Sequence, residues 1–143
     1  MRPRLHRVTP FPPAVGESAD LCLRLQAELE LRPQAVLLHV HGEADAYTLS
    51  RWRRILDAAL AEATTGYLVV DLSDTEFLGC RPILDLADRA QQALTRGIRV
   101  AIYNPVPGVV NRIIDVAGLS TWLPIHTSLP EALTTHLPLA PGA

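Results

Sequence analysis

Hydrophobic and polar residues alternate strictly near the start of the chain. A leucine or alanine stands at every second position from Leu21 to Leu29, and polar residues or a cysteine stand between them. A period of two is typical of a strand with one face turned to water. Turn residues at 32–34 interrupt the pattern, and a second, more apolar segment runs from Ala35 to His41. The two segments are predicted to pair as a β-hairpin.

Helical periodicity begins after a polar turn at 42–45. Apolar residues recur at spacings of three and four from Leu49 to Ala63, which predicts a helix with one apolar face. By the same spacing, further helices are predicted over residues 80–96, 109–117 and 130–136. Apolar runs bounded by turn residues predict strands at 67–72, 98–103 and 122–125.

The predicted order is therefore β-β-α-β-α-β-α-β-α. Strands that alternate with helices after an initial hairpin are typical of an α/β sandwich. We expect a four- to five-stranded, mostly parallel sheet with an N-terminal β-hairpin and with helices packed on the sheet. A single domain is expected over residues 21–137. Proline and polar residues predict a flexible leader at 1–20 and a flexible tail at 138–143.

Composition narrows the class of protein. The 143 residues are 48% hydrophobic and 20% charged with a net charge of -2, as in an ordinary globular domain. The chain lacks the excess of basic residues that would indicate direct nucleic-acid binding. No apolar run is long enough to span a membrane. Cys22 and Cys80 are too few for a disulfide framework or an all-cysteine zinc site, so a reducing, cytoplasmic location is expected. No cofactor is expected.

Several polar residues allow more than one interpretation. His39 and His41 share a strand face, but no further ligand completes a metal site, so a surface pair is expected. Asp71 ends a predicted strand and is expected either to face a functional crevice or to bind loop amides. The arginines around Trp52 indicate a solvated helix face that could attract an acidic partner, while Trp52 itself is expected in the core.

Four groups of residues, in order along the chain, resemble the STAS domain family. This family includes bacterial anti-sigma-factor antagonists and the cytoplasmic tails of sulfate transporters. The matching segments are Val40–Asp45, Val69–Ser73 with Phe77–Leu78, Gly97–Val100 and Asn104–Leu119. The resemblance covers roughly residues 21–137 and implies the family's α/β fold.

The resemblance also draws attention to a motif at the start of the second predicted helix. Family members carry F-x-D-S-x-G there, and its serine is phosphorylated by a partner kinase, often an anti-sigma factor. Here Gly79 stands for the aspartate, Cys80 for the serine and Pro82 for the glycine, with Arg81 between them. Phosphoryl transfer needs a positioned hydroxyl and a nearby carboxylate, and proline removes an N–H that could bind phosphate. The chain is therefore predicted not to be switched by phosphorylation at Cys80.

By resemblance, the chain is expected to be a non-catalytic, bacterial regulatory module that acts in transcription control and signalling. Its expected partner is an anti-sigma factor or a related kinase-like regulator, and a homodimer is left open. The predicted partner-binding residues are Asp45, Ser73, Asp74, Cys80, Arg81, Asp85, Asp88 and Arg89. Asp45 has a second interpretation as a cap of the first helix.

Two alternative functions remain. One is a STAS subunit of a larger signalling or lipid-transport assembly. The other is a thiol-based sensor, because a helix N-terminus and the adjacent Arg81 would favour the thiolate of Cys80. Against the sensor, Cys80 is also interpreted as a small residue that a degenerate loop tolerates.

Overall fold

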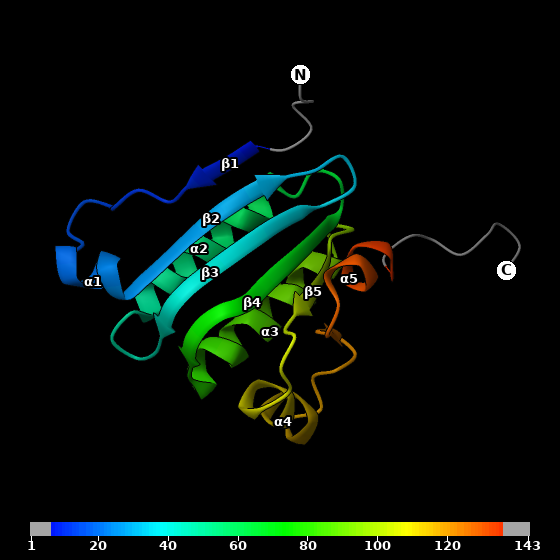
Figure 1. The fold of residues 1–143 in the computed structure, drawn as a ribbon. Helices are drawn as coiled ribbons and strands as arrows, with labels where there is room; N and C mark the ends of the chain where they lie inside the picture. Colours follow the sequence, from blue (N-terminus) through cyan, green and yellow to red (C-terminus); the bar gives the residue numbers. More distant parts are fainter. Residues whose placement is uncertain (1–6, 136–143) are drawn as a thin grey trace, which may run out of the picture.

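The computed structural model describes residues 7–135, which fold around one mixed sheet (Figure 1). Its strands are β1 (Arg7–Pro10), β2 (Leu25–Leu31), β3 (Val36–Ala44), β4 (Tyr67–Leu78), β5 (Arg99–Tyr103) and β6 (Ile125–His126). Its helices are α1 (Ala19–Arg24), α2 (Leu49–Glu62), α3 (Cys80–Leu94), α4 (Val109–Val116) and α5 (Leu129–Thr135). Apart from β1 and α1, the order of elements is the predicted one.

The six strands lie in the sheet in the order in which they occur in the sequence. β1, β2 and β3 pair antiparallel, whereas β3, β4, β5 and β6 pair parallel. The predicted hairpin and the mostly parallel remainder are both confirmed. The strand β1 makes the sheet one strand wider than the four to five strands expected.

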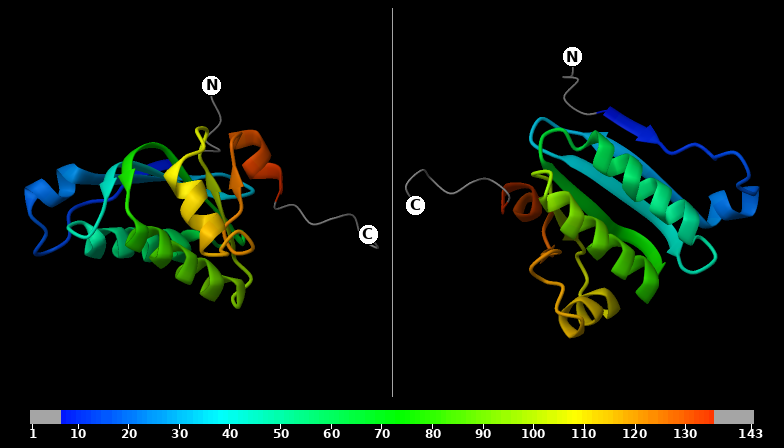
Figure 2. Two further views of the ribbon diagram at one scale, coloured as in Figure 1. Left: turned by 90° about the horizontal axis from the view of Figure 1, so that it is seen from below. Right: turned by 180° about the vertical axis from the view of Figure 1, so that it is seen from behind.

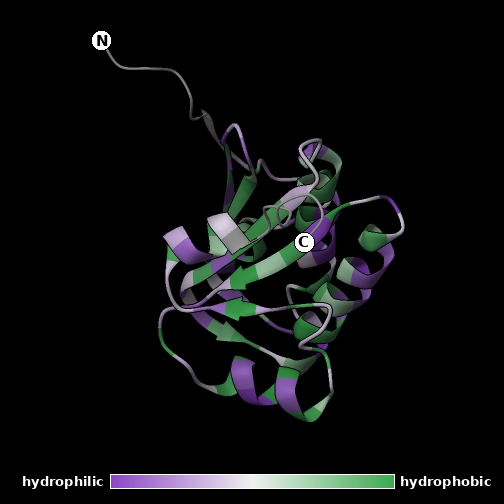
Figure 3. Ribbon diagram, turned by 90° about the vertical axis from the view of Figure 1, so that its right-hand side faces the viewer, coloured by the Kyte–Doolittle hydropathy of each residue, from purple (hydrophilic) through white to green (hydrophobic). Residues whose placement is uncertain are grey.

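Helices α2 and α3 lie on one side of the sheet and α5 on the other (Figure 2). The main core lies between the sheet and α2 and α3, and Trp52 is fully buried there, as predicted. A smaller core lies under α5, where the Tyr67 hydroxyl donates to the Ala132 carbonyl. Hydropathy follows the same layers, since the central strands are mainly hydrophobic and the surface helices carry bands of both kinds (Figure 3).

The predicted hairpin is wrong at its N-terminal end, where a strand was expected from Leu21 onward. Residues 19–24 form α1, because the Ser18 hydroxyl accepts a hydrogen bond from the Leu21 amide at 3.1 Å and starts a helix. Leu23 consequently points to solvent rather than into the core, with 72% of its surface exposed. The strand begins only at Leu25.

The segment expected to be a leader contains a strand. Residues 7–10 form β1, which pairs antiparallel with β2, so that the backbone groups along the outer side of β2 find partners. The predicted tail at 138–143 lies outside the described residues. β3 also differs from expectation, because it continues through the predicted turn as far as Ala44.

Candidate functional site

The start of α3 lies at the carboxyl end of β4, beside the turn that follows β3. The Gly79 amide donates to the Ala44 carbonyl at 2.9 Å, and the parallel register pairs Ala44 with Leu78. Asp45 and Cys80, distant in sequence, therefore come from neighbouring ends of adjacent strands. Cys80 is exposed at the first position of α3.

Hydrogen bonds to its backbone hold the loop before α3 in place. The Trp52 indole N–H donates to the Pro82 carbonyl at 3.0 Å, which ties the first turn of α3 to α2. Proline is well suited to a first helical turn, where its missing N–H leaves no intrahelical bond unmade. The N-cap is Gly79, which has no side chain to bond the free amides of the helix. Neither a hydroxyl nor a carboxylate stands at positions 79–80, as the sequence indicated.

Asp85, one of the predicted partner-binding residues, is buried rather than exposed on α3. Its surface is only 8% exposed, and its carboxylate accepts from Arg53 Nε at 2.6 Å and from Arg81 Nε at 3.5 Å. Burial acts to raise the pKa of Asp85, but the hydrogen bond and charge of Arg53 outweigh it, so the pKa lies below its usual value. Asp85 therefore holds Arg81 at the loop and does not itself present a charge.

The two remaining predicted residues of α3 lie further along the helix. Asp88 is exposed, and Arg89 forms a two-bond ion pair with Asp57 of α2, at 2.7 and 3.3 Å. The rise of an α-helix places Arg89 about 13 Å from Cys80 along the axis. The predicted residues thus form an elongated surface along α3 and not one compact site.

Asp45 closes the turn before α2 but does not cap the helix. Its Oδ1 accepts from the amides of Tyr47 and Thr48 at 3.0 and 3.1 Å, and both residues precede the first helical position. Its Oδ2 lies 3.9 Å from Arg24 Nη1, and its side chain is 27% exposed. Asp45 is therefore a turn-forming residue with one oxygen directed to the surface.

Asp71 binds a backbone amide, but that amide belongs to Ser73 of the same strand, β4, and not to a loop. Its Oδ1 accepts from the Ser73 amide at 2.9 Å and from the Ser73 hydroxyl at 2.6 Å. Asp74, the next residue of β4, is highly exposed, and its Oδ2 lies 3.4 Å from His41 Nδ1. Ser73 and Asp74 therefore lie on β4, several residues before the strand ends at Leu78.

His39 is not part of a plain surface pair. It lies half-buried between two carboxylates, with Nδ1 2.7 Å from Asp71 and Nε2 2.8 Å from Glu30. The hydrogen bond with Asp71 is the main cause that raises the pKa of His39 to about 9, with Glu30 adding to it against the effect of burial. The protonated ring donates to both acids and joins β2, β3 and β4.

A pocket that the sequence did not indicate adjoins this region. Its volume is about 310 Å³, and it lies between the end of β4 and the segment that enters α4. Three exposed apolar residues line it, namely Phe77, Val106 and Val109. Its walls come from segments about 30 positions apart, so no local sequence pattern marks it.

Within residues 7–135, no group of three or more histidine, cysteine, aspartate or glutamate residues is arranged to hold a metal ion. None of the helices described in that part of the chain is long and apolar enough to cross a membrane.

Comparison with known proteins identifies relatives of this chain. The model of the STAS domain matches residues 26–132. A Mycobacterium tuberculosis protein named as a candidate anti-anti-sigma factor is 36% identical over 123 residues, which cover 85% of this chain and 82% of that protein. The anti-sigma-F factor antagonist RsfA of the same species is 32% identical over 111 residues, covering 77% of this chain and 86% of RsfA.

A solved structure agrees with these relatives. The crystal structure of an anti-sigma factor antagonist from Mycobacterium paratuberculosis superposes with a TM-score of 0.67 and 26% identity, covering 77% of this chain and 92% of that one. The family match spans every strand from β3 to β6, helices α2 to α4, most of β2, the first half of α5 and all of the Cys80 loop. The chain belongs to the STAS domain family.

Proposed function

We propose that this chain is an anti-sigma factor antagonist that binds its partner without catalysis and without a phosphorylation switch at Cys80. The names of its relatives support the class of partner. The observation that carries the rest is the start of α3, where an exposed thiol replaces the hydroxyl and a glycine replaces the carboxylate. The loop is held in place by backbone contacts and presents no acceptor for phosphate.

The proposed contact surface centres on the neighbouring ends of β3 and β4. Asp45 contributes an acidic group there, and Arg81 contributes a basic group oriented by Asp85. Ser73 and Asp74 extend the surface back along β4, and Cys80, Asp88 and Arg89 extend it along α3. A surface with charges of both signs is typical of the polar rim of a protein–protein interface.

Loss of the switch has a consequence for regulation. A phosphate on this loop would add about two negative charges to the contact surface and would change its charge complementarity to the partner. Without it, the fraction of partner that is bound is set by a constant affinity and by the concentrations of the two proteins. We therefore propose constitutive binding, with the amount of this protein as the controlling variable.

The test is calorimetric titration of the purified chain with each anti-sigma factor of its host. We expect one of them to bind, and Arg81→Glu to weaken that binding at least tenfold, because a charge at the centre of the surface is reversed. Arg96→Glu is the matched control, since Arg96 is also exposed but follows the far end of α3. Failure of every anti-sigma factor to bind, or equal losses in the two variants, would contradict the proposal.

A further inference from the structure

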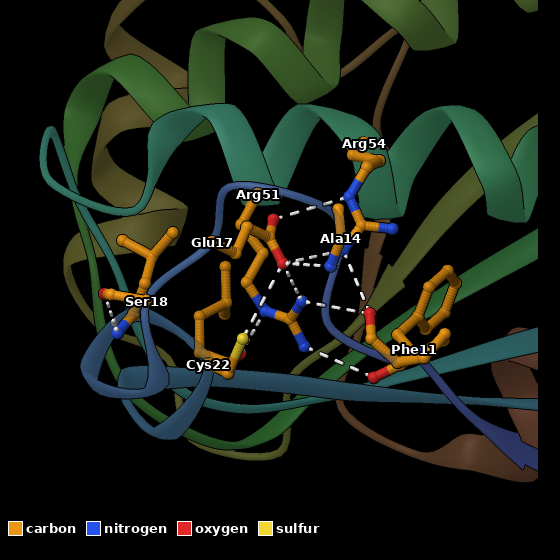
Figure 4. A network of polar contacts seen from close by, with 10 residues as sticks. Phe11, Ala14, Glu17, Ser18, Cys22, Arg51 and Arg54 are labelled. Carbon is orange, nitrogen blue, oxygen red and sulfur yellow. Dashed lines mark hydrogen bonds and ion pairs between the residues drawn. The ribbon is translucent and has the colours of Figure 1, made fainter.

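Residues 11–24 pack against the family-matched part of the chain although they lie outside it, since the match begins at residue 26. A charge cluster holds this segment on α2 (Figure 4). Glu17 Oε1 accepts from Arg51 Nη1 at 2.8 Å, from Arg54 Nη2 at 3.0 Å and from the Ala14 amide at 2.9 Å. We call Glu17, Arg51 and Arg54 the Glu17 clamp.

The clamp is buried on one side. The Arg51 side chain is 2% exposed, and its Nε donates to the Leu25 carbonyl at 2.7 Å. Arg51 also reaches the carbonyls of Phe11 and Pro12, each at 3.4 Å. An arginine with this many acceptors on two segments gives the N-terminal segment a single position on α2. The helix that follows the segment is therefore held in a defined place.

That helix, α1, packs against the turn that carries Asp45. Gly42 has a φ of +97°, and a Cβ there would lie 2.1 Å from the Arg24 carbonyl oxygen, so only glycine allows the two backbones to meet. Arg24 Nη1 lies 3.0 Å from Glu43 and 3.9 Å from Asp45. Its guanidinium stacks over the Tyr47 ring at 5.0 Å from the ring centre.

These contacts produce a continuous outer surface, which we call the α1 face: Asp20, Leu23, Arg24, Glu43, Asp45 and Tyr47. Leu23 and Tyr47 are 72% and 53% exposed, so an aliphatic and an aromatic side chain lie open to solvent on it. The Tyr47 hydroxyl donates to Asp20 at 3.2 Å, which holds the ring beside the helix. Exposed tyrosine and arginine side chains are the types that most often dominate the energy of protein interfaces.

The charges of the α1 face specify what fits it. Its three carboxylates share a single arginine, which leaves an excess of two negative charges around the two apolar side chains. A partner segment with a basic side chain next to an apolar one complements both features. Asp45 belongs to this face and to the proposed contact surface, so the two surfaces are continuous.

We propose that the α1 face is the part of the interface that selects this chain's own anti-sigma factor, by binding a basic and apolar segment of that partner. The proposal rests on the proposed function. The family-matched surface supplies the general contact, and α1, fixed by the Glu17 clamp, adds a contact that proteins without this segment lack.

The test compares three variants with the wild-type chain by calorimetric titration with the anti-sigma factors that bind the wild type. Leu23→Ser and Tyr47→Ala, combined, should lower the affinity for the tightest-binding partner at least tenfold and reduce its preference over the other anti-sigma factors. Val116→Ser is the control, because Val116 is 83% exposed on α4, away from the α1 face. It should change neither quantity. Leu23→Ser alone is measured as well, because it changes only an exposed side chain and Tyr47→Ala could impair folding. This single variant should itself lower the affinity severalfold.

The outcomes separate the two proposals. A wild-type chain that binds no anti-sigma factor overturns the proposed function and this inference together. A wild-type chain that binds, is weakened by Arg81→Glu and is unaffected by Leu23→Ser overturns this inference alone. An affinity loss in the Leu23 and Tyr47 variants that is equal for all anti-sigma factors assigns the α1 face to binding strength and overturns its role in selection.

Discussion

The N-terminal segment and the start of α3 both pack against α2, but different kinds of contact hold them there. The N-terminal segment is held by buried side-chain charges, with Glu17 and Arg51 at 2.8 Å. The start of α3 is held mainly through its backbone, since the Pro82 carbonyl accepts from Trp52 and the Gly79 amide donates to Ala44. Backbone contacts do not depend on which side chain stands at position 80. The loop can therefore change its chemistry while it keeps its shape, whereas loss of Glu17 from the clamp would leave the charge of Arg51 buried without a counter-charge.

The largest expected effect comes from breaking the clamp. Glu17→Gln keeps the size of the side chain but leaves Arg51, which is 2% exposed, without its counter-charge. Removing one partner of a buried ion pair typically costs 3–5 kcal/mol, so we expect the free energy of unfolding to fall by about 3 kcal/mol. Urea denaturation followed by circular dichroism measures this difference.

Arg54→Gln is the control for that variant. Arg54 binds the same carboxylate but is 36% exposed, so its loss leaves the Arg51–Glu17 pair in place and should cost under about 1 kcal/mol. Equal costs for the two substitutions would mean that the clamp is an ordinary surface ion pair. The contrast between the two segments would then be wrong.

A smaller effect on the free energy of unfolding is expected when a rise in pH removes the proton from His39. Its pKa is raised to about 9 in the folded chain, so the folded state retains the proton that the unfolded state releases near pH 6.5. The stabilisation is complete below about pH 6.5 and is lost as the pH rises through about 9. With allowance for partial exposure of the ring, we expect a loss of about 2 kcal/mol over this interval.

The comparison variant for this prediction is His39→Gln. It should be less stable than the wild type at pH 6 and should approach it at pH 9.5, because the wild type then has a neutral ring between Asp71 and Glu30. His41→Gln should follow the pH dependence of the wild type, since His41 is more exposed and its carboxylate contacts are longer, at 3.4 and 3.6 Å. Parallel curves for the wild type and His39→Gln would refute the assignment.

The sequence predicted those elements whose hydrophobic pattern is local. The stripe on α2 and the apolar run at the start of β4 were recognised because each repeats within one segment and faces the same core. The pattern from Leu21 to Leu29 was misread at its start, because a period of two outweighed the weaker signal of a serine cap at Ser18. Strand β1 could not be predicted, because its four residues are a strand only through pairing with β2.

Strand pairing and packing between elements decide how the candidate residues are arranged. Asp45 and Cys80 follow strands that are parallel neighbours, so the fold brings their two segments together. The burial of Asp85 depends on Arg53 of another helix, and the position of His39 depends on acids from two other strands. Contacts of this kind arise from packing between elements and leave no periodic trace in the chain.

The smallest effect on stability is expected at Cys80 itself, and it sharpens the contrast between fixed backbone and free side chain. Cys80→Ser should change the free energy of unfolding by less than about 0.5 kcal/mol, because the side chain is exposed. The single variant should also take up no phosphate from the cognate anti-sigma factor and ATP, since Gly79 supplies no carboxylate and Pro82 no amide. The triple variant Gly79→Asp, Cys80→Ser, Pro82→Gly restores all three groups on a backbone that Trp52 and Ala44 still hold. Intact-protein mass measurement should find one phosphate on the triple variant only, and stoichiometric phosphate on wild-type Cys80 would overturn the proposed loss of the switch.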